Sequence, residues 1–184
     1  MNNKITSFSG EHRFLSNFWP ISVVFEDKVY PSTEHAYQAS KTTDENLREQ
    51  IRKMKTPGDA KNFGQQLEKR PDWNDAMRIA HMTILVEIKF SMRNLELAKK
   101  LLETKDAELI EGNTWGDTFF GVYNGIGENH LGRILMATRE KLRITVRDIQ
   151  DTLDACKWKR REAVQRLGIA ERTLNMYIQV FKLG

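Results

Sequence analysis

The spacing of apolar and polar residues predicts a mostly helical chain with one β-hairpin near its N-terminus. Residues 8–30 combine aromatic and β-branched side chains with a turn at Asp27 and Lys28, which is typical of two short strands. Beyond them, apolar residues recur every three or four positions, as on one face of a helix. This spacing predicts helices over residues 34–40, 44–55, 59–66, 72–90, 95–103 and 130–142. The predicted fold class is α+β, predominantly helical.

The C-terminal part of the chain forms a separate pattern. Residues 144–184 carry the apolar positions of three short helices, and Gly168 supplies a residue that accepts positive φ between two of them. Residues 145–184 also contain eight Lys or Arg against five Asp or Glu, a balance of +3 within a net charge of +4 for the whole chain. We therefore expect two domains, one over residues 1–143 and an all-α domain over residues 144–184.

Composition narrows the class of protein. Charged residues make up 29% of the chain and apolar residues 40%, and no apolar run is long enough to cross a membrane. Residues 1–8 lack the apolar stretch of a signal peptide. The single cysteine, Cys156, excludes an internal disulfide and a cysteine-built zinc site. These features predict a cytoplasmic protein without a membrane partner.

The segment from Ser32 to Lys41 is the first candidate for chemistry. On the helix expected to begin after Ser32 or Thr33, the side chains of Glu34, Gln38 and Lys41 lie at positions i, i+4 and i+7 and so share one face. Such a face is often simply solvated surface. The alternative is a site in which the Glu34 carboxylate accepts a proton or stabilises a cation, while the Lys41 amine acts as a nucleophile.

The second candidate lies largely in a glycine-rich stretch over residues 109–129 and consists of Asn113–Asp117 followed by Gly121–Gly132. Its glycines would let the backbone approach a ligand, Trp115 offers a ring for stacking, and Asp117 could orient water. The same stretch could equally be a structural loop folded around its own aromatic side chains. Asn129 is expected to cap the following helix, whose N-terminus could face an anion. The histidines are not spaced as metal ligands, and neither a metal site nor a cofactor is expected.

Several motifs follow one another along residues 8–143. They are Phe14-Leu-Ser-Asn-Phe18, Tyr30-Pro-Ser-Thr-Glu-His-Ala-Tyr-Gln-Ala-Ser-Lys41, Ala60-Lys61 with Gly64, Arg70 with Asp72-Trp73, Lys89-Phe90, Trp115-Gly-Asp117, and Gly127-Glu-Asn-His-Leu-Gly132 with Leu135-Met136 and Arg139. Together they resemble the NADAR family of YbiA-like N-glycosidases. The resemblance implies hydrolysis of an N-glycosidic bond on a ribose phosphate or an ADP-ribose group. The substrate classes of that family are unstable ribosylamino intermediates of riboflavin synthesis and ADP-ribose attached to guanine bases.

The resemblance also assigns roles to individual residues. Glu34 would stabilise positive charge at the anomeric carbon or act as acid-base, Lys41 would attack the opened sugar as a Schiff-base nucleophile, and Asp117 would be a polar catalytic partner. Because Lys41 must then be neutral, burial must outweigh the effect of nearby Glu34. The residues expected to bind substrate are Asn17, Phe18, His35, Gln38, Trp115, Gly116 and Asn129. The chain departs from the family pattern at Thr118–Gly121, where many members have a second glycine directly, and a bulkier cavity mouth is expected.

In the C-terminal part, residues 163–174 resemble a Fis-type helix-turn-helix. The implied partner is DNA, with a recognition helix around residues 171–181 in the major groove and a homodimer as a natural corollary. The residues expected to contact DNA are Lys159, Arg160, Arg161, Arg172, Asn175 and Gln179. The alternative is a helical appendage that packs on the first domain or on a second copy of the chain.

Two classes of function follow from these patterns. The first is an N-glycosidase that acts on an ADP-ribosyl group, guanine- or DNA-linked, or on a ribosylamino phosphate of riboflavin synthesis. The second is a non-catalytic, DNA-binding regulator that senses ADP-ribose or NAD. The presence of both Glu34 and Lys41 favours the enzyme, because a protein that only binds the ligand needs neither.

Overall fold

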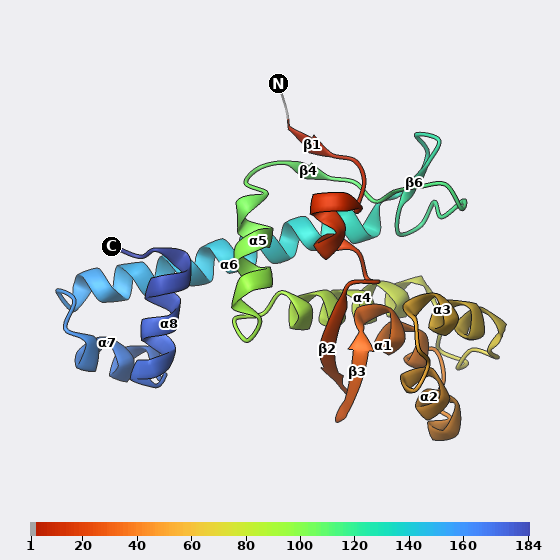
Figure 1. Cartoon of the computed structure of the whole chain (residues 1–184), viewed down its shortest axis with the longest axis horizontal. Helices are drawn as coiled ribbons and strands as arrows, with labels where there is room; N and C mark the ends of the chain where they lie inside the picture. The colour runs from red at the N-terminus through yellow and green to blue at the C-terminus, as the bar shows by residue number, and fades with distance from the viewer. Residues whose placement is uncertain (1–2) are drawn as a thin grey trace. The chain divides into compact units, whose positions relative to one another are not determined.

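The β-hairpin expected near the N-terminus is present in the computed structural model, which describes residues 3–184 (Figure 1). Strands β2 (Pro20–Phe25) and β3 (Lys28–Ser32) pair antiparallel. The two connecting residues, Glu26 and Asp27, both have positive φ, which is the geometry of a two-residue hairpin turn. The turn therefore lies one residue earlier than the sequence pattern indicated.

The helices after the hairpin follow the predicted order. They are α1 (Thr33–Ala39), α2 (Glu45–Arg52), α3 (Pro57–Gln66) and α4 (Asp75–Lys89). Ser32 caps α1, since its Oγ accepts a hydrogen bond from the His35 backbone N–H at 3.3 Å. Helix α4 begins at Asp75, later than predicted. Asn74 precedes the helix, and its Oδ1 accepts a hydrogen bond from the Met77 N–H at 2.9 Å, as a capping residue does. Helix α2 is likewise shorter than predicted.

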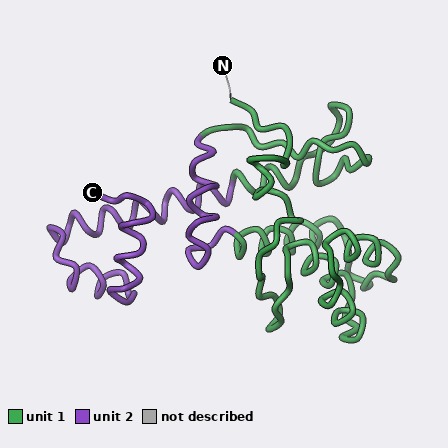
Figure 2. Tube along the Cα trace, in the orientation of Figure 1, with its two compact units in different colours: residues 1–89, 106–136 green, residues 90–105, 137–184 purple. Residues whose placement is uncertain are grey.

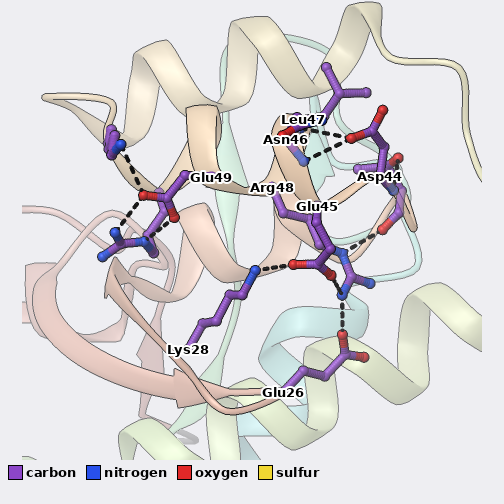
Figure 3. Close-up of polar contacts among 11 residues, drawn as sticks. Glu26, Lys28, Asp44, Glu45, Asn46, Leu47, Arg48 and Glu49 are labelled. Carbon is purple, nitrogen blue, oxygen red and sulfur yellow. Dashed lines mark hydrogen bonds and ion pairs between the residues drawn. The ribbon is translucent and has the colours of Figure 1, made fainter.

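Ion pairs join helix α2 to the turn of the β2–β3 hairpin (Figure 3). Glu45 pairs with Lys28, and Arg48 Nη1 donates to Glu26 Oε2 at 2.6 Å. Asp44 caps the first turn of the helix. The ion pairs thus connect α2 to the hairpin, and α2 also packs against α1.

Helix α1 lies at the centre of this part of the fold. It packs against α2, α3, α4 and both strands of the hairpin, and all of its residues are buried (Figure 1). Polar side chains on α1 are consequently held away from bulk water. This burial excludes the purely solvated face that remained open for Glu34, Gln38 and Lys41, which are 6%, 3% and 8% exposed.

The glycine-rich stretch folds as short strands and turns. Strand β4 (Glu108–Leu109) pairs in parallel with β1 (Lys4–Ile5), and β5 (Gly112–Asn113) pairs in parallel with β6 (Val122–Tyr123). The 3-10 helix η1 (Gly10–Leu15) precedes the hairpin. The stretch is therefore an ordered part of the fold with its own hydrogen bonds.

The chain divides into two compact units (Figure 2). The first comprises residues 1–89 and 106–136, and the second comprises residues 90–105 and 137–184. Helix α6 (His130–Ala155) begins in the first unit and continues into the second. The expected end of this helix at Leu142 is therefore wrong, and the boundary expected after residue 143 falls inside α6.

Helix α6 continues because its apolar positions keep a helical spacing across that boundary. Leu131, Leu135, Leu142, Ile149 and Leu153 are all buried, and neither glycine nor proline interrupts the sequence between them after Gly132. A change in charge along the chain does not by itself end a helix.

The second unit consists of helices. They are α5 (Leu95–Glu103), the C-terminal part of α6, α7 (Arg160–Leu167) and α8 (Glu171–Phe181). Gly168, with φ of 64°, lies in the turn between α7 and α8 as expected. The core is built from Ile149, Leu153, Cys156, Ala163 and Leu174. Because α5 packs against α8, residues expected in the first domain join the C-terminal helices. Across residues 3–184, no helix combines the length and apolar character needed to cross a membrane.

Candidate active site

A cavity of about 920 Å³ lies in the first unit. Its lining comes from α1, α3, α4, residues 16–18 and residues 111–120. Most of the predicted site residues line it: Glu34, Lys41, Asp117, Asn17, Phe18, Gln38, Trp115 and Gly116. The fold thus brings together residues that are up to 100 positions apart (Asn17 and Asp117).

Glu34 is held in the cavity wall by hydrogen bonds at both ends. Its backbone N–H donates to the Asn17 carbonyl at 3.1 Å, and its Oε1 accepts from Gln38 Nε2 at 2.6 Å. Burial raises the pKa of the Glu34 carboxyl, while the Gln38 hydrogen bond and the positive charges of Lys61 and Lys41 oppose that rise. Its carboxyl therefore has a fixed orientation and a pKa above its usual value.

Lys41 follows α1 on the same wall. Its Nζ donates to the Gly64 carbonyl at 3.4 Å and lies 5.6 Å from the centre of the Tyr37 ring. Burial lowers the pKa of the Lys41 amine to about 8, although the negative charge of Glu34 opposes the shift. A substantial fraction of the amine is therefore neutral just above neutral pH, as a nucleophile requires.

Two buried acceptors in the cavity wall lack hydrogen-bond partners among residues 3–184. Asn17 Nδ2 donates to Met82 Sδ at 3.2 Å, whereas Asn17 Oδ1 accepts from no group in that part of the chain. The same holds for Gln38 Oε1. Because an unsatisfied buried acceptor costs free energy, a hydroxyl or N–H group of a ligand would be stabilised at either atom.

Trp115 and Phe18 form an aromatic border around a lysine. Trp115 is 60% exposed, and Lys61 Nζ lies 4.9 Å from its ring centre and 5.9 Å from that of Phe18. An exposed indole beside a cation suits a flat, electron-rich ring with an anionic substituent. The exposed Trp115 ring therefore offers a surface on which a base can stack.

Asp117 holds the turn in which it lies. Its Oδ1 accepts from the backbone N–H groups of Phe119 and Phe120, both at 3.0 Å. Phe120 is 7% exposed and packs edge-on against Tyr37, with 5.4 Å between ring centres. Phe120, one of the aromatic residues after the Trp-Gly-Asp motif, therefore packs into the cavity wall. In this structure, the Asp117 side chain fixes the backbone of that turn.

His35 and Asn129 do not line the cavity. His35 Nδ1 lies 2.7 Å from Ser32 Oγ, and its Nε2 lies 3.2 Å from the Met54 carbonyl oxygen. Asn129 Nδ2 donates to the Leu109 carbonyl at 2.9 Å. Both side chains bind neighbouring parts of the fold and contact substrate only if the cavity rearranges.

The predicted cap of α6 is also wrong. Asn129 Oδ1 accepts from the Glu111 N–H at 3.1 Å instead of from the helix. The first helical N–H groups, those of His130 and Leu131, donate to the carbonyls of Phe119 and Phe120. These donors are already used within the protein and do not face an anion.

Several cavity residues were missed as site residues. Lys61 and Trp73 occur in the family motifs but were given no role, whereas Lys69, Arg78 and Glu111 belong to no predicted constellation. Arg78 donates to Asp75 Oδ1 at 2.7 Å, and its guanidinium lies 3.5 Å from the Phe119 ring centre. Among the described residues, no group of His, Cys, Asp and Glu is arranged to hold a metal ion.

Comparison with known proteins identifies the family. The NADAR domain model matches residues 6–143 of the chain. N-glycosidase YbiA of Escherichia coli (strain K12) is 37% identical over 143 residues, which cover 75% of this chain and 86% of that protein. A riboflavin biosynthesis protein of Vibrio vulnificus (strain YJ016) is 40% identical over 134 residues, 71% of this chain, and the match spans 36% of that longer protein.

The fold agrees with these sequence matches. The NMR structure of the Escherichia coli protein YbiA superimposes with a TM-score of 0.65 at 31% identity, covering 79% of this chain and 88% of that one. The match includes most of the unit that carries the cavity and extends well beyond any single motif. The chain therefore belongs to the NADAR domain family, and the names of its relatives support an N-glycosidase enzyme.

Proposed function

We propose that the cavity hydrolyses the N-glycosidic bond of a phosphorylated ribosyl substrate, with Lys41 as the nucleophile and Glu34 as the carboxylate beside the anomeric carbon. The observation that carries this proposal is a carboxyl and an amine, both more than nine-tenths buried, in the wall of one cavity. A protein that only bound an anionic ligand would have no use for a buried amine whose pKa lies near 8.

The chemistry needs a neutral amine first. Lys41 Nζ forms a bond to the anomeric carbon while the bond from that carbon to the base nitrogen breaks, and the electron pair of the broken bond leaves with the base. The bond from the anomeric carbon to the ring oxygen then breaks, a proton of Nζ passes to that oxygen, and the opened sugar is held to Lys41 as a protonated Schiff base. Water adds to the carbon of this Schiff base, and the bond from that carbon to Nζ breaks with its electron pair on Nζ, which releases Lys41 and the free sugar. Positive charge develops at the anomeric carbon in both steps, and the Glu34 carboxylate stabilises it.

Charges around the cavity support a phosphorylated substrate. Lys61 and Lys69 line the cavity and have no ion-pair partner among the described residues, whereas Arg78 is paired with Asp75. Ammonium groups of this kind bind phosphate oxygens. A volume of about 920 Å³ accommodates a group as large as ADP-ribose. The proposed substrate is therefore an ADP-ribosyl group linked to guanine or DNA, with a ribosylamino phosphate as the alternative.

Product analysis tests the activity and the substrate together. The protein is incubated with DNA that carries ADP-ribosyl-guanine and, separately, with a ribosylamino-pyrimidine 5-phosphate, and released sugar is measured by mass spectrometry. Release of ADP-ribose from the DNA is the expected result. Turnover of the ribosylamino phosphate alone would instead support a role in riboflavin synthesis. Binding of ADP-ribose without release from either substrate would support the sensing regulator.

We also propose that α7 and α8 bind DNA. The specific observation in favour is that these helices are joined by a short turn at Gly168, and all the side chains expected to contact DNA are exposed. Arg160 Nη1 donates to Asn175 Oδ1 at 3.0 Å, so this pair links the two helices at the face in question. Such a domain would place the hydrolase near nucleic acid, and the dimer that it commonly forms stays a prediction.

The salt dependence of DNA binding tests this second proposal. Replacing Lys159 and Arg161 together by alanine is expected to reduce the slope of log K against log salt by about 2, since each lost phosphate contact removes about one released counterion. The matched control replaces Arg52 and Lys53 of the first unit, which removes the same charge. Fluorescence anisotropy with a labelled duplex measures both slopes, and equal slopes in the two variants would contradict DNA binding through this face.

A further inference from the structure

One of the carboxyl groups that line the cavity, that of Glu111, has no role in the proposed mechanism. Glu111 lines the cavity from the segment that follows β4, whereas Glu34 and Lys41 come from α1 and its C-terminal end. Its side chain is partly buried, and among the described residues its carboxyl oxygens have no hydrogen-bonded partner. Glu111 therefore presents an uncommitted acid to whatever occupies the cavity.

The backbone of Glu111 is firmly anchored. Its N–H donates to Asn129 Oδ1 at 3.1 Å, and its carbonyl accepts from the Val122 N–H at 2.8 Å. A side chain at Gly121 would collide with this carbonyl, so glycine is required there for the close approach. Asn129, which was expected to bind substrate, thus fixes the position of Glu111 instead.

Charged groups from four parts of the fold act on this carboxyl. Burial raises the pKa of Glu111 to about 8, and the negative charges of Asp117 on its own segment and Glu34 on α1 contribute to the rise. The positive charges of Lys61 on α3 and Lys89 on α4 oppose it. Glu111 therefore carries a proton in most molecules at neutral pH.

The other three acids that line the cavity, Glu34, Asp75 and Asp117, all accept hydrogen bonds. Asp117 Oδ1 accepts from two backbone N–H groups, and Glu34 Oε1 accepts from Gln38. Glu34 also faces the positive charges of Lys61 and Lys41, which favour its ionised form. Burial raises the pKa of Glu34 as it does that of Glu111, but Glu34 accepts a hydrogen bond that favours its ionised form, whereas Glu111 faces two negative charges that favour its protonated form. Such a difference between two carboxyl groups suits an acid and a charge-stabilising partner.

We propose that Glu111 is a catalytic residue of this cavity, the general acid that protonates the departing base. This role rests on the proposed N-glycosidase function. As the bond between the anomeric carbon and the base nitrogen breaks, its electron pair remains on that nitrogen, which takes the proton of Glu111. Glu111 is left as a carboxylate. When water adds to the sugar carbon bound to Lys41, the hydroxyl stays on the carbon and the released proton returns to Glu111.

The position of the base platform agrees with this role. Trp115, whose exposed ring can stack a base, belongs to the same cavity-lining segment as Glu111. Glu34 belongs to α1, and Lys41, which carries the attacking amine, follows the end of that helix. The sugar would therefore meet α1 while the base nitrogen meets the segment that carries the acid, so that nucleophile and acid act on opposite ends of the breaking bond.

A series of leaving groups provides the test. N-aryl ribosylamine 5-phosphates, made from anilines of increasing basicity, are hydrolysed by the wild-type protein and by Glu111→Gln. A weakly basic leaving group such as 4-nitroaniline needs little proton donation, so its kcat/KM is expected to change little. For the most basic anilines, the variant is expected to lose about 10²-fold or more, which gives it a much steeper dependence on leaving-group basicity.

The pH profile provides a second readout. In the wild-type protein, kcat/KM should rise with pH as Lys41 loses its proton and fall as Glu111 loses its own, both near pH 8. The alkaline fall should be absent in Glu111→Gln and retained in Glu111→Asp, which keeps an acid. If Glu111→Gln does not fold, as judged by circular dichroism, Glu111→Asp decides the outcome through this alkaline limb.

The control is Glu108→Gln, the same change three residues earlier on β4, where the side chain pairs with Lys4 at the surface. It should behave as the wild type does in both measurements. An equal loss for every leaving group in Glu111→Gln, with the alkaline limb intact, would overturn the role of Glu111 alone. No turnover of any substrate by the wild type would overturn the N-glycosidase function and this role with it.

Discussion

Replacing Lys41 by alanine is expected to lower kcat by about 10³-fold or more, because the covalent step loses its nucleophile while the cavity keeps its other contacts. The substitution also removes a buried amine, so the protein should not lose stability through an unpaired charge. Binding of ADP-ribose should persist, since Lys61 and Lys69 remain in the cavity wall. Steady-state kinetics and isothermal titration calorimetry measure the two effects separately.

The variant Lys41→Arg separates nucleophilic from purely electrostatic action. A guanidinium keeps the positive charge but stays protonated, so it cannot form a Schiff base. It should therefore be as inactive as Lys41→Ala. Borohydride reduction during turnover should leave a covalent sugar adduct on the wild type, detected as added mass, and none on either variant. Wild-type kcat in Lys41→Arg would show that Lys41 acts only through its charge.

The matched control is Lys69→Ala, which removes another cation from the same cavity. Lys69 is exposed and takes no part in the proposed covalent step. Its loss should raise KM by about tenfold, the effect of one exposed contact to a phosphate, and leave kcat nearly unchanged. A fall in kcat equal to that of Lys41→Ala would mean that the cavity responds to any loss of positive charge.

Helix α1 illustrates what the sequence could and could not predict. Helical spacing alone predicts that Glu34, Gln38 and Lys41 share one face. The sequence also predicts a cap at Ser32 or Thr33, and in the structure the cap is Ser32. Spacing could not decide whether that face is solvated. The answer depends on α2, α3, α4 and the hairpin, which surround α1 through contacts between residues distant in the chain.

The resemblance to the NADAR family supplied residues that no periodicity would have selected. Asn17 and Phe18 lie in an irregular segment after η1, and both line the cavity. The sequence indicates them only because they belong to the family motif Phe14–Phe18. The family motif over residues 127–132 likewise predicts that Asn129 contacts substrate. A motif indicates that a residue is important, but it does not indicate which way the side chain faces. In the structure, that side chain binds Leu109 and Glu111.

Glu111 shows the opposite limit. It is one acidic residue in a stretch of glycines and apolar positions, and nothing local distinguishes it from Glu108, which lies at the surface. Its chemical character arises from burial and from the charges of Asp117 and Glu34. Because such neighbours are brought together only by the tertiary fold, no reading of local sequence pattern could have identified the acid.

Replacing Gly132 by alanine is expected to destabilise the first unit by about 3 kcal/mol, because a Cβ at this position would collide with the Leu109 backbone carbonyl and the Asn129 side chain. The first obstacle is backbone, and both polar atoms of the Asn129 side chain are already hydrogen-bonded, to the Glu111 N–H and the Leu109 carbonyl. For a chain of this size, the loss corresponds to a fall in Tm of about 6–12 °C, which calorimetry measures. The matched control is Gly58→Ala at the start of α3.

Alanine at Gly58 would meet Thr56 Oγ1 at an ordinary 3.6 Å, so this substitution should stabilise the protein slightly, by about 0.5 kcal/mol. Equal Tm values for the two variants would contradict the close approach of α6 to β4. Gly132→Ala also displaces Asn129, which holds the Glu111 N–H and the Leu109 carbonyl. At temperatures where the variant remains folded, its activity should therefore fall most for basic leaving groups, as in Glu111→Gln. The stability of this turn and the placement of the proposed acid then depend on the same glycine.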